Sequence, residues 1–156
     1  MPGNLSIFTH SSELSSAQFH ALYELDQHHF PIPWTKQAWQ SYFDSHSDYL
    51  IMAYFESNSP QVLGFALWQT SAADSFAHLL KIAVDSHFRQ KGAGEKIMKA
   101  SLTALNSKQI KDYFLEVEEN NSAAVTLYKK MGFKTIHKKE KFYSNGEAAL
   151  IMTLSI

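Results

Sequence analysis

The chain has 156 residues, which is enough for one domain but leaves too little material for a second core. Apolar residues make up 45% and charged residues 19%, as is typical of a compact globular protein. There are 14 Lys and Arg against 15 Asp and Glu, so no overall charge favours nucleic acid or a membrane surface as a direct partner. We therefore expect a single domain over residues 1–156.

The residue types that are missing exclude several kinds of site. Cysteine is absent, which rules out disulfides, thiolate zinc sites and a cysteine nucleophile, and fits a reducing compartment. The eight histidines include no HExxH pair, so we expect surface or packing histidines and no metal. No window approaches the roughly 18 apolar residues of a membrane span, and the first residues do not read as a signal peptide. The sequence thus predicts a cytoplasmic protein without a membrane segment.

The first third of the chain is expected to form a strand and two helices. Ser15 and Gln18 have the spacing of a capping box, which marks the start of a helix. The prolines in Phe30-Pro31-Ile32-Pro33 end that helix, because a proline disfavours helix in the residue before it. The expected elements are a strand at Leu5–Thr9, a helix from the Ser15 cap to about His29, and a second helix capped by Thr35 that carries Trp39 and Phe43.

The rest of the chain alternates strands with two further helices. Two helices are expected: one starts at Gly94 and has Ile97, Met98, Leu102 and Leu105 as its apolar stripe, and the other spans Ser122–Met131. The expected strands are Tyr49–Glu56, Val62–Gln69, Phe76–Val84, Tyr113–Val117, Phe133–Ile136 and Ala148–Leu154. The strand–helix–strand passage in the middle requires a parallel crossover, whereas the hairpins require antiparallel neighbours. The fold class is therefore α/β, with a central mixed sheet flanked by helices.

A glycine-rich turn with positive charge joins the strand Phe76–Val84 to the helix that follows. It reads Arg89-Gln90-Lys91-Gly92-Ala93-Gly94. A helix start offers unpaired backbone N–H groups and the positive end of the helix dipole, and glycines let a phosphate approach that backbone closely. Arg89 and Lys91 add charge beside it. A ligand that carries a diphosphate is the natural occupant.

Several interpretations of this turn compete. A P-loop requires GxxxxGK[ST], which is absent. A dinucleotide fingerprint requires a third glycine where Ile97 stands, and the preceding strands look like antiparallel hairpins, although Glu116 lies near the distance of a ribose-binding carboxylate. An R-x-x-G-x-G phosphate loop and an ordinary glycine-lined turn without a ligand remain open.

Downstream residues carry a family resemblance. The R-x-x-G-x-G run after a strand resembles motif A of the GNAT superfamily of N-acetyltransferases, and Leu115-Glu116-Val117 followed by N-x-x-A-x-x-L-Y-x-x-x-G-F from Asn121 to Phe133 resembles its motif B. Ile82-Ala83-Val84-Asp85, Pro33-Trp34-Thr35 and Phe142-Tyr143 resemble the RimI-type N-terminal protein acetyltransferases. The resemblance runs from about His28 to the end of the chain. It implies a GNAT fold whose mixed sheet is splayed where acetyl-CoA enters.

The resemblance assigns the chemistry to two side chains. Glu116 would act as the general base, through a water molecule, and Tyr128 as the general acid toward the sulfur of CoA. Without the family resemblance, Glu116 also fits a solvent-exposed charged residue, and Tyr128 also fits a packing residue of an amphipathic helix.

The resemblance also implies a site for acetyl-CoA that needs no metal. Backbone groups of Ile82, Ala83 and Val84 would pair with the pantetheine arm and the acetyl carbonyl. Asn121 would contact the CoA arm, although it also fits a plain helix cap. Glu95 departs from the family, which often has a basic residue there, and it suits a nearby pyrophosphate only if its carboxylate points away. The expected cofactor contacts are Ile82, Ala83, Val84, Arg89, Gln90, Lys91, Gly92, Ala93, Gly94, Glu95 and Asn121.

The resemblance places the acceptor between the Phe30–Trp34 and Lys139–Tyr143 loops, which implies Trp34 and Tyr143 as binding residues. An α-amine has a pKa of about 7.7–8.0 against about 10.4 for lysine, so keeping it neutral is easier by about 3 kcal/mol. The favoured function is acetylation of a protein N-terminus, such as that of a ribosomal protein. The alternatives are acetylation of a small amine, such as a polyamine or amino sugar, and an acyl-CoA-binding module without turnover. The presence of both Glu116 and Tyr128 argues against the last.

Overall fold

The computed structural model of the chain describes residues 3–9, 13–30, 33–45, 48–71 and 73–156, and the side chains of these residues apart from 42–45. In chain order the elements are β1 Gly3–Phe8, α1 Ser16–His29, α2 Lys36–Ser45, β2 Tyr49–Glu56, β3 Val62–Ser71, β4 Phe76–Val84, the short 3-10 helix η2 Ser86–Phe88, α3 Ala93–Ser107, β5 Asp112–Glu118, α4 Ser122–Lys130, β6 Lys134–Lys139 and β7 Ala149–Ser155. The predicted order of strands and helices is confirmed.

Local sequence signals set the ends of the first two helices. The capping box is present: Gln18 N donates to Ser15 Oγ at 3.1 Å, and Ser15 N donates to Gln18 Oε1 at 2.9 Å. Helix α1 ends where Phe30 turns to an extended conformation, and the predicted stop at Pro31-Ile32 lies outside the described residues. Thr35 Oγ1 caps α2 by accepting from Ala38 N at 3.0 Å. The side chain of Phe43, predicted to lie on α2, is also outside the described part.

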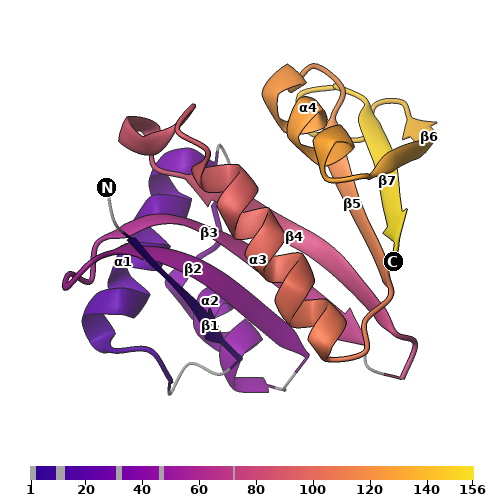
Figure 1. Cartoon of the computed structure of the whole chain (residues 1–156). Coiled ribbons are helices and arrows are strands. Elements are labelled where there is room, and N and C mark those ends of the chain that lie inside the picture. Colours follow the sequence, from indigo (N-terminus) through magenta and orange to yellow (C-terminus); the bar gives the residue numbers. More distant parts are fainter. Residues whose placement is uncertain (1–2, 10–12, 31–32, 46–47, 72) are drawn as a thin grey trace.

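One seven-stranded sheet organises the fold, in the order β1-β2-β3-β4-β5-β7-β6. Among the strands that the structure describes, β4 and β5 alone run parallel to each other, so the sheet is mixed as predicted. These two strands pair over three residues alone, from Phe76 opposite Asp112 to His78 opposite Phe114. Just beyond, β4 carries one extra residue against β3, at Leu80, and such bulges bend and twist a strand. From that point β4 and β5 diverge, so the sheet is splayed (Figure 1).

Helices cover both faces of the sheet and enclose two cores. Helix α3 lies across one face, while α1 and α2 lie behind the opposite face (Figure 1). The α3 side buries Trp68, Ile97, Met98 and Tyr113, and α4 joins it through Tyr128. The α1 and α2 side buries Leu22, Trp39, Phe65 and Leu67. No described helix is long and apolar enough to cross a membrane.

Candidate active site

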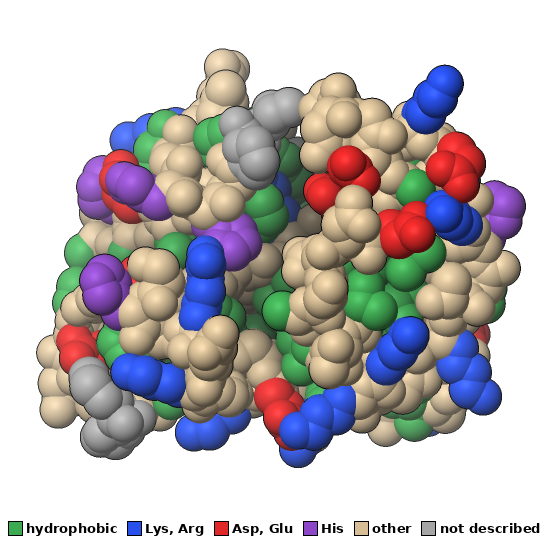
Figure 2. All heavy atoms as spheres, turned by 90° about the horizontal axis from the view of Figure 1, so that it is seen from above, with side chains coloured by type: hydrophobic (Ala, Val, Ile, Leu, Met, Phe, Trp, Pro, Cys, Tyr) green, Lys and Arg blue, Asp and Glu red, His purple; other side chains and the backbone are tan. Residues whose placement is uncertain are grey.

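A cleft of about 870 Å³ opens where β4 and β5 separate. Seen from above, it is the hollow between the half that contains α1–β4 and the half that contains α4 and β5–β7 (Figure 2). Residues from the helices of both faces line it, so it passes from one side of the sheet to the other. The predicted site residues that line it are Trp34, Ile82, Ala83, Val84, Arg89, Gln90, Gly92, Ala93, Gly94, Glu116, Asn121, Tyr128 and Tyr143; Lys91 and Glu95 are not among the lining residues.

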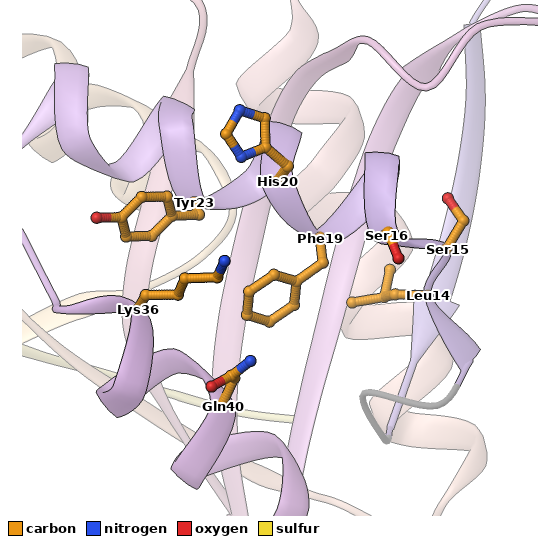
Figure 3. A pocket seen from close by; sticks show the side chains of 8 residues that line it. All are labelled: Leu14, Ser15, Ser16, Phe19, His20, Tyr23, Lys36 and Gln40. Carbon is orange, nitrogen blue, oxygen red and sulfur yellow. The ribbon is translucent and has the colours of Figure 1, made fainter.

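A second, smaller pocket of about 280 Å³ lies on the outer side of α1 and α2. Figure 3 shows Phe19 between the two helices, with Leu14 at the helix start and Lys36 and Gln40 reaching from α2. None of the predicted site residues lines this pocket.

Along one wall of the cleft, strand β4 has backbone groups that are not paired with another described strand. Its residues from Leu79 to Val84 lie next to β3 on one side. On the other side, where β5 pairs with Phe76–His78, no described strand pairs with them. Buried backbone N–H and C=O groups require hydrogen-bond partners. A linear amide-bearing molecule that lies along Ile82, Ala83 and Val84 would supply them.

The start of α3 forms the end of this wall. Gly92 is the N-cap in a left-handed conformation (φ +78°), and no side chain caps the helix. The first backbone N–H groups of α3 are therefore open to an anion, as expected of a phosphate cradle. A Cβ added at Gly94 would lie 3.4 Å from Leu127 and 3.8 Å from Val84, two residues that line the cleft, so the absent side chain leaves room between α4 and β4.

The two basic residues of the turn have different environments. Arg89 lines the cleft, where its Nε donates to the Val84 carbonyl at 3.2 Å and its Nη2 lies 3.0 Å from His29 Nδ1. Burial and the Arg89 charge lower the pKa of His29, so this imidazole stays neutral and accepts the hydrogen bond. Lys91 instead lies over the ring of Phe88, 5.6 Å from its centroid.

Glu95 points away from the cleft. Its two carboxylate oxygens lie 2.8 Å from Lys99 Nζ and 2.8 Å from Lys130 Nζ. These hydrogen bonds lower the pKa of Glu95 to about 2, so it is ionised at neutral pH and its charge is offset by two lysines. This is the orientation that the sequence analysis required of a carboxylate beside a pyrophosphate site.

Glu116 has a partner that the sequence analysis did not identify. Glu116 Oε2 lies 2.6 Å from His78 Nε2, across the gap between β5 and β4. The imidazole stacks on Phe114, with ring centroids 3.9 Å apart and planes 15° apart. His78 is a packing residue, as expected of the histidines, but it also holds the predicted base. No local signal links two residues that are 38 positions apart.

Tyr128 and Tyr143 line the same cleft as Glu116. Tyr128 is 4% exposed, and burial together with the neighbouring Tyr143 raises its pKa above the usual range of a phenol. The hydroxyl is thus protonated at neutral pH, and it makes no hydrogen bond to the residues that the structure describes. Burial, Glu116 and Glu118 raise the pKa of Tyr143 to about 12. A carboxylate and a protonated phenol therefore line the same cleft.

Asn121 is the N-cap of α4, as its position in the sequence predicted without the family resemblance. Its Oδ1 accepts from Ala124 N at 3.2 Å, which caps α4. Asn121 also lines the cleft, so both expected roles are sterically compatible.

A buried ion pair supports Trp34 on the acceptor side. Asp26 is 0% exposed and accepts from Lys81 Nζ at 2.6 Å, Trp39 Nε1 at 2.7 Å and Trp34 N at 3.0 Å. Lys81 Nζ lies over the rings of Phe30 and Trp34, at 4.6 and 4.5 Å from their centroids. Sequence reasoning missed this network, since Asp26 and Lys81 are 55 positions apart. Pro31 and Ile32 of the predicted acceptor loop lie outside the described residues.

No metal centre is evident among the residues described: they contain no group of three or more His, Asp or Glu side chains that could hold an ion.

Comparisons with known proteins identify the same architecture. The profile of the Acetyltransferase (GNAT) family matches residues 19–133. A [ribosomal protein bS18]-alanine N-acetyltransferase from Haemophilus ducreyi is 30% identical over 140 residues, which are 87% of this chain and 92% of that protein. The ribosomal-protein-S18-alanine N-acetyltransferase from Escherichia coli superposes with a TM-score of 0.81 at 26% identity, over 98% of this chain and 94% of that one.

A more distant structure shares the fold. The NatC complex bound to Gag peptide and CoA has a chain that matches with a TM-score of 0.81 at 19% identity, over 98% of this chain and 99% of that one. The profile match alone spans well over half of the 156 residues, and it includes the turn before α3, Glu116 and Tyr128. The chain therefore belongs to the GNAT family and is an N-acetyltransferase.

Proposed function

We propose that this protein transfers the acetyl group of acetyl-CoA to the N-terminal α-amine of another protein, and that the acceptor is a ribosomal protein. One observation carries the proposal: the splayed cleft has Glu116 and Tyr128 along it and passes through the sheet, so that cofactor and acceptor can enter from opposite faces. The relatives from Haemophilus ducreyi and Escherichia coli are both named as alanine N-acetyltransferases of ribosomal protein S18, which suggests the acceptor class.

The side of the cleft that faces α3 and α4 suits acetyl-CoA. The unpaired edge of β4 matches the amides of a pantetheine arm, and the uncapped start of α3 matches a pyrophosphate. When bound there, acetyl-CoA supplies an activated thioester. Ile82, Ala83 and Val84 would hold the arm, while Gly92, Ala93 and Gly94 would hold the phosphates.

Two side chains of this chain would move the protons. A protein N-terminus reaches the cleft mainly as an ammonium ion, and Glu116 takes a proton from it, through a water molecule, to free the nucleophilic amine. Tyr128 would give its phenolic proton to the departing sulfur, and the second proton that the nitrogen loses as the amide forms would restore the phenol. The raised pKa of Tyr128 means that its hydroxyl is protonated before the acetyl transfer. One proton is released per turnover, because an ammonium ion becomes an amide while a thioester becomes a thiol.

The acceptor side suits a backbone terminus more than a polyamine. Trp34 and Tyr143 provide two aromatic walls with polar edges, which fit a short peptide end with a small first residue. Glu116 and Glu118 are the acidic residues among those that line the cleft, and Glu116 is already hydrogen-bonded to His78. A polyamine would require several converging carboxylates that are free. We place the reaction in the cytoplasm, where ribosomal proteins are made.

A panel of acceptors tests this proposal. The kcat/KM is measured for a peptide with a free N-terminal alanine, for the same peptide with a blocked N-terminus and an internal lysine, and for spermidine. The free peptide is expected to exceed the blocked one by at least tenfold, because an α-amine is easier to deprotonate by about 3 kcal/mol. Equal values, or a preference for spermidine, would replace the proposal with acetylation of a small amine. Acetyl-CoA binding without any product would indicate a binding module.

A further inference from the structure

We propose that His78 is a positioning residue for the acetyl transfer: it donates a hydrogen bond that fixes the carboxylate of Glu116 in the orientation in which it accepts a proton. This inference rests on the proposed function, since it takes Glu116 as the base. Nothing in the sequence motifs of the turn or of α4 points to His78, which lies near the start of β4.

The position of His78 follows from the splay of the sheet. His78 and Phe114 are the last paired residues of the β4–β5 ladder. Glu116 lies two residues beyond Phe114, so it projects from the same face of β5 and is the first residue on that face beyond the paired segment. The imidazole bridges this opening at its narrow end, with Nε2 at 2.6 Å from Glu116 Oε2.

Neighbouring aromatic rings fix the imidazole itself. His78 stacks on Phe114 at 3.9 Å between centroids, and Phe76 stacks on the same ring at 4.7 Å. Its side chain is 21% exposed, and that of Glu116 is 25% exposed. A half-enclosed ring that is held by stacking loses little further freedom when it makes a hydrogen bond, so the bond is effective in orienting its partner.

The direction of the bond follows from its chemistry. An ionised carboxylate only accepts hydrogen bonds, so Nε2 carries the hydrogen and donates it. Hydrogen bonds to a charged group are shorter and stronger than neutral ones, in agreement with 2.6 Å. With Oε2 engaged, Oε1 has no partner among the described residues, and it is the oxygen left to accept the proton from water.

His78 acts through Glu116 and does not contact the ligands. It is not among the residues that line the cleft, whereas Glu116 is. Its loss is therefore expected to change the rate of the chemical step and not the binding of either substrate. Partners that orient the ligands of a metal typically contribute about 10–100-fold to activity, and we expect an effect of the same size for a partner that orients a base.

Three variants at position 78 separate this role from packing. His78→Phe keeps a stacking ring but removes the donor, His78→Asn has a donor too short to reach Glu116, and His78→Gln places an amide N–H near the position of Nε2. We expect His78→Phe and His78→Asn to lower kcat by about 10–100-fold, with the acceptor KM and the Kd of acetyl-CoA within about twofold of wild type. His78→Gln should restore most of the loss. His137→Phe, at an exposed position on β6, is the matched control and should leave kcat unchanged.

A double-mutant cycle with Glu116→Gln gives the decisive readout. Once the carboxylate is gone, His78→Phe should change kcat by less than about twofold, because coupled residues are not additive. Full additivity of the two changes, or near wild-type kcat in His78→Phe, would overturn the inference. If His78→Phe does not fold, the comparison of His78→Gln with His78→Asn decides it, and equal kcat values for these two would contradict it. Wild-type activity on the free peptide is measured first, so failure of the proposed function is recognised separately.

Discussion

The buried pair of Asp26 and Lys81 yields a quantitative prediction for Lys81→Met. The substitution keeps most of the aliphatic stem. It leaves the carboxylate of Asp26, which is 0% exposed, with the donors from Trp34 and Trp39 alone among the residues that the structure describes. Removing one partner of a buried ion pair typically costs about 3–5 kcal/mol, because the remaining charge is uncompensated. For a chain of this length, 1 kcal/mol corresponds to roughly 2–4 °C in Tm, so a decrease of about 6–20 °C is expected.

Urea unfolding followed by tryptophan fluorescence measures this cost, since Trp34 and Trp39 both lie in the network. The double variant Asp26→Asn/Lys81→Met removes both charges, and it should lose at least about 2 kcal/mol less than the sum of the two single variants. A loss below about 1 kcal/mol for Lys81→Met, or additive single losses, would refute the reasoning that this pair is a coupled buried unit. Because Trp34 is held by Asp26, Lys81→Met should also raise the acceptor KM more than the Kd of acetyl-CoA.

Two further predictions concern the cleft, and a third concerns Tyr113 of the core on the α3 side. Gly94→Leu fills the space between Val84 and Leu127 without backbone strain, so calorimetry should show at least about tenfold weaker acetyl-CoA binding by a folded protein; unchanged affinity would contradict a cofactor site there. Tyr128→Phe should lower kcat by about 10²–10⁴ with cofactor affinity retained, and near-full turnover, with chemistry shown to be rate-limiting, would remove Tyr128 from the mechanism. Burial raises the pKa of Tyr113 from 10.0 to about 12, so its contribution to the free energy of unfolding is complete below pH 10 and is lost as the pH rises toward 12. Urea unfolding at a series of pH values across that interval should therefore show a smaller loss of this free energy for Tyr113→Phe than for wild type.

Much of the fold could be predicted because its signals are local. The capping box of Ser15 and Gln18, the apolar stripe of α3 and the run of buried-type residues in β4 each lie within a short window, and all three are present. Strand ends were less predictable. The last strand pairs with both β5 and β6, and β6 extends to Lys139 although all its side chains are exposed, because backbone pairing with β7 maintains it.

The site could be predicted only where a motif carries it. The turn from Arg89 to Gly94 and the segment that holds Asn121 and Tyr128 are contiguous, so the residues that line the cleft there could be named in advance. His78 and Lys81 could not, because their partners, Glu116 and Asp26, lie far away in the sequence and meet them only when the sheet is assembled. The orientation of Glu95 toward Lys130 of α4 is of the same kind.

The central claim is that this chain acetylates a protein N-terminus with acetyl-CoA, using Glu116 and Tyr128. The most direct measurement incubates a purified ribosomal protein that has a free N-terminal alanine with isotopically labelled acetyl-CoA, and then locates the label by peptide mass spectrometry. We expect one acetyl group, on the α-amine, and a label at least about 100-fold slower to appear with Glu116→Gln. Label on lysine side chains instead, or equal rates with Glu116→Gln, would contradict the account.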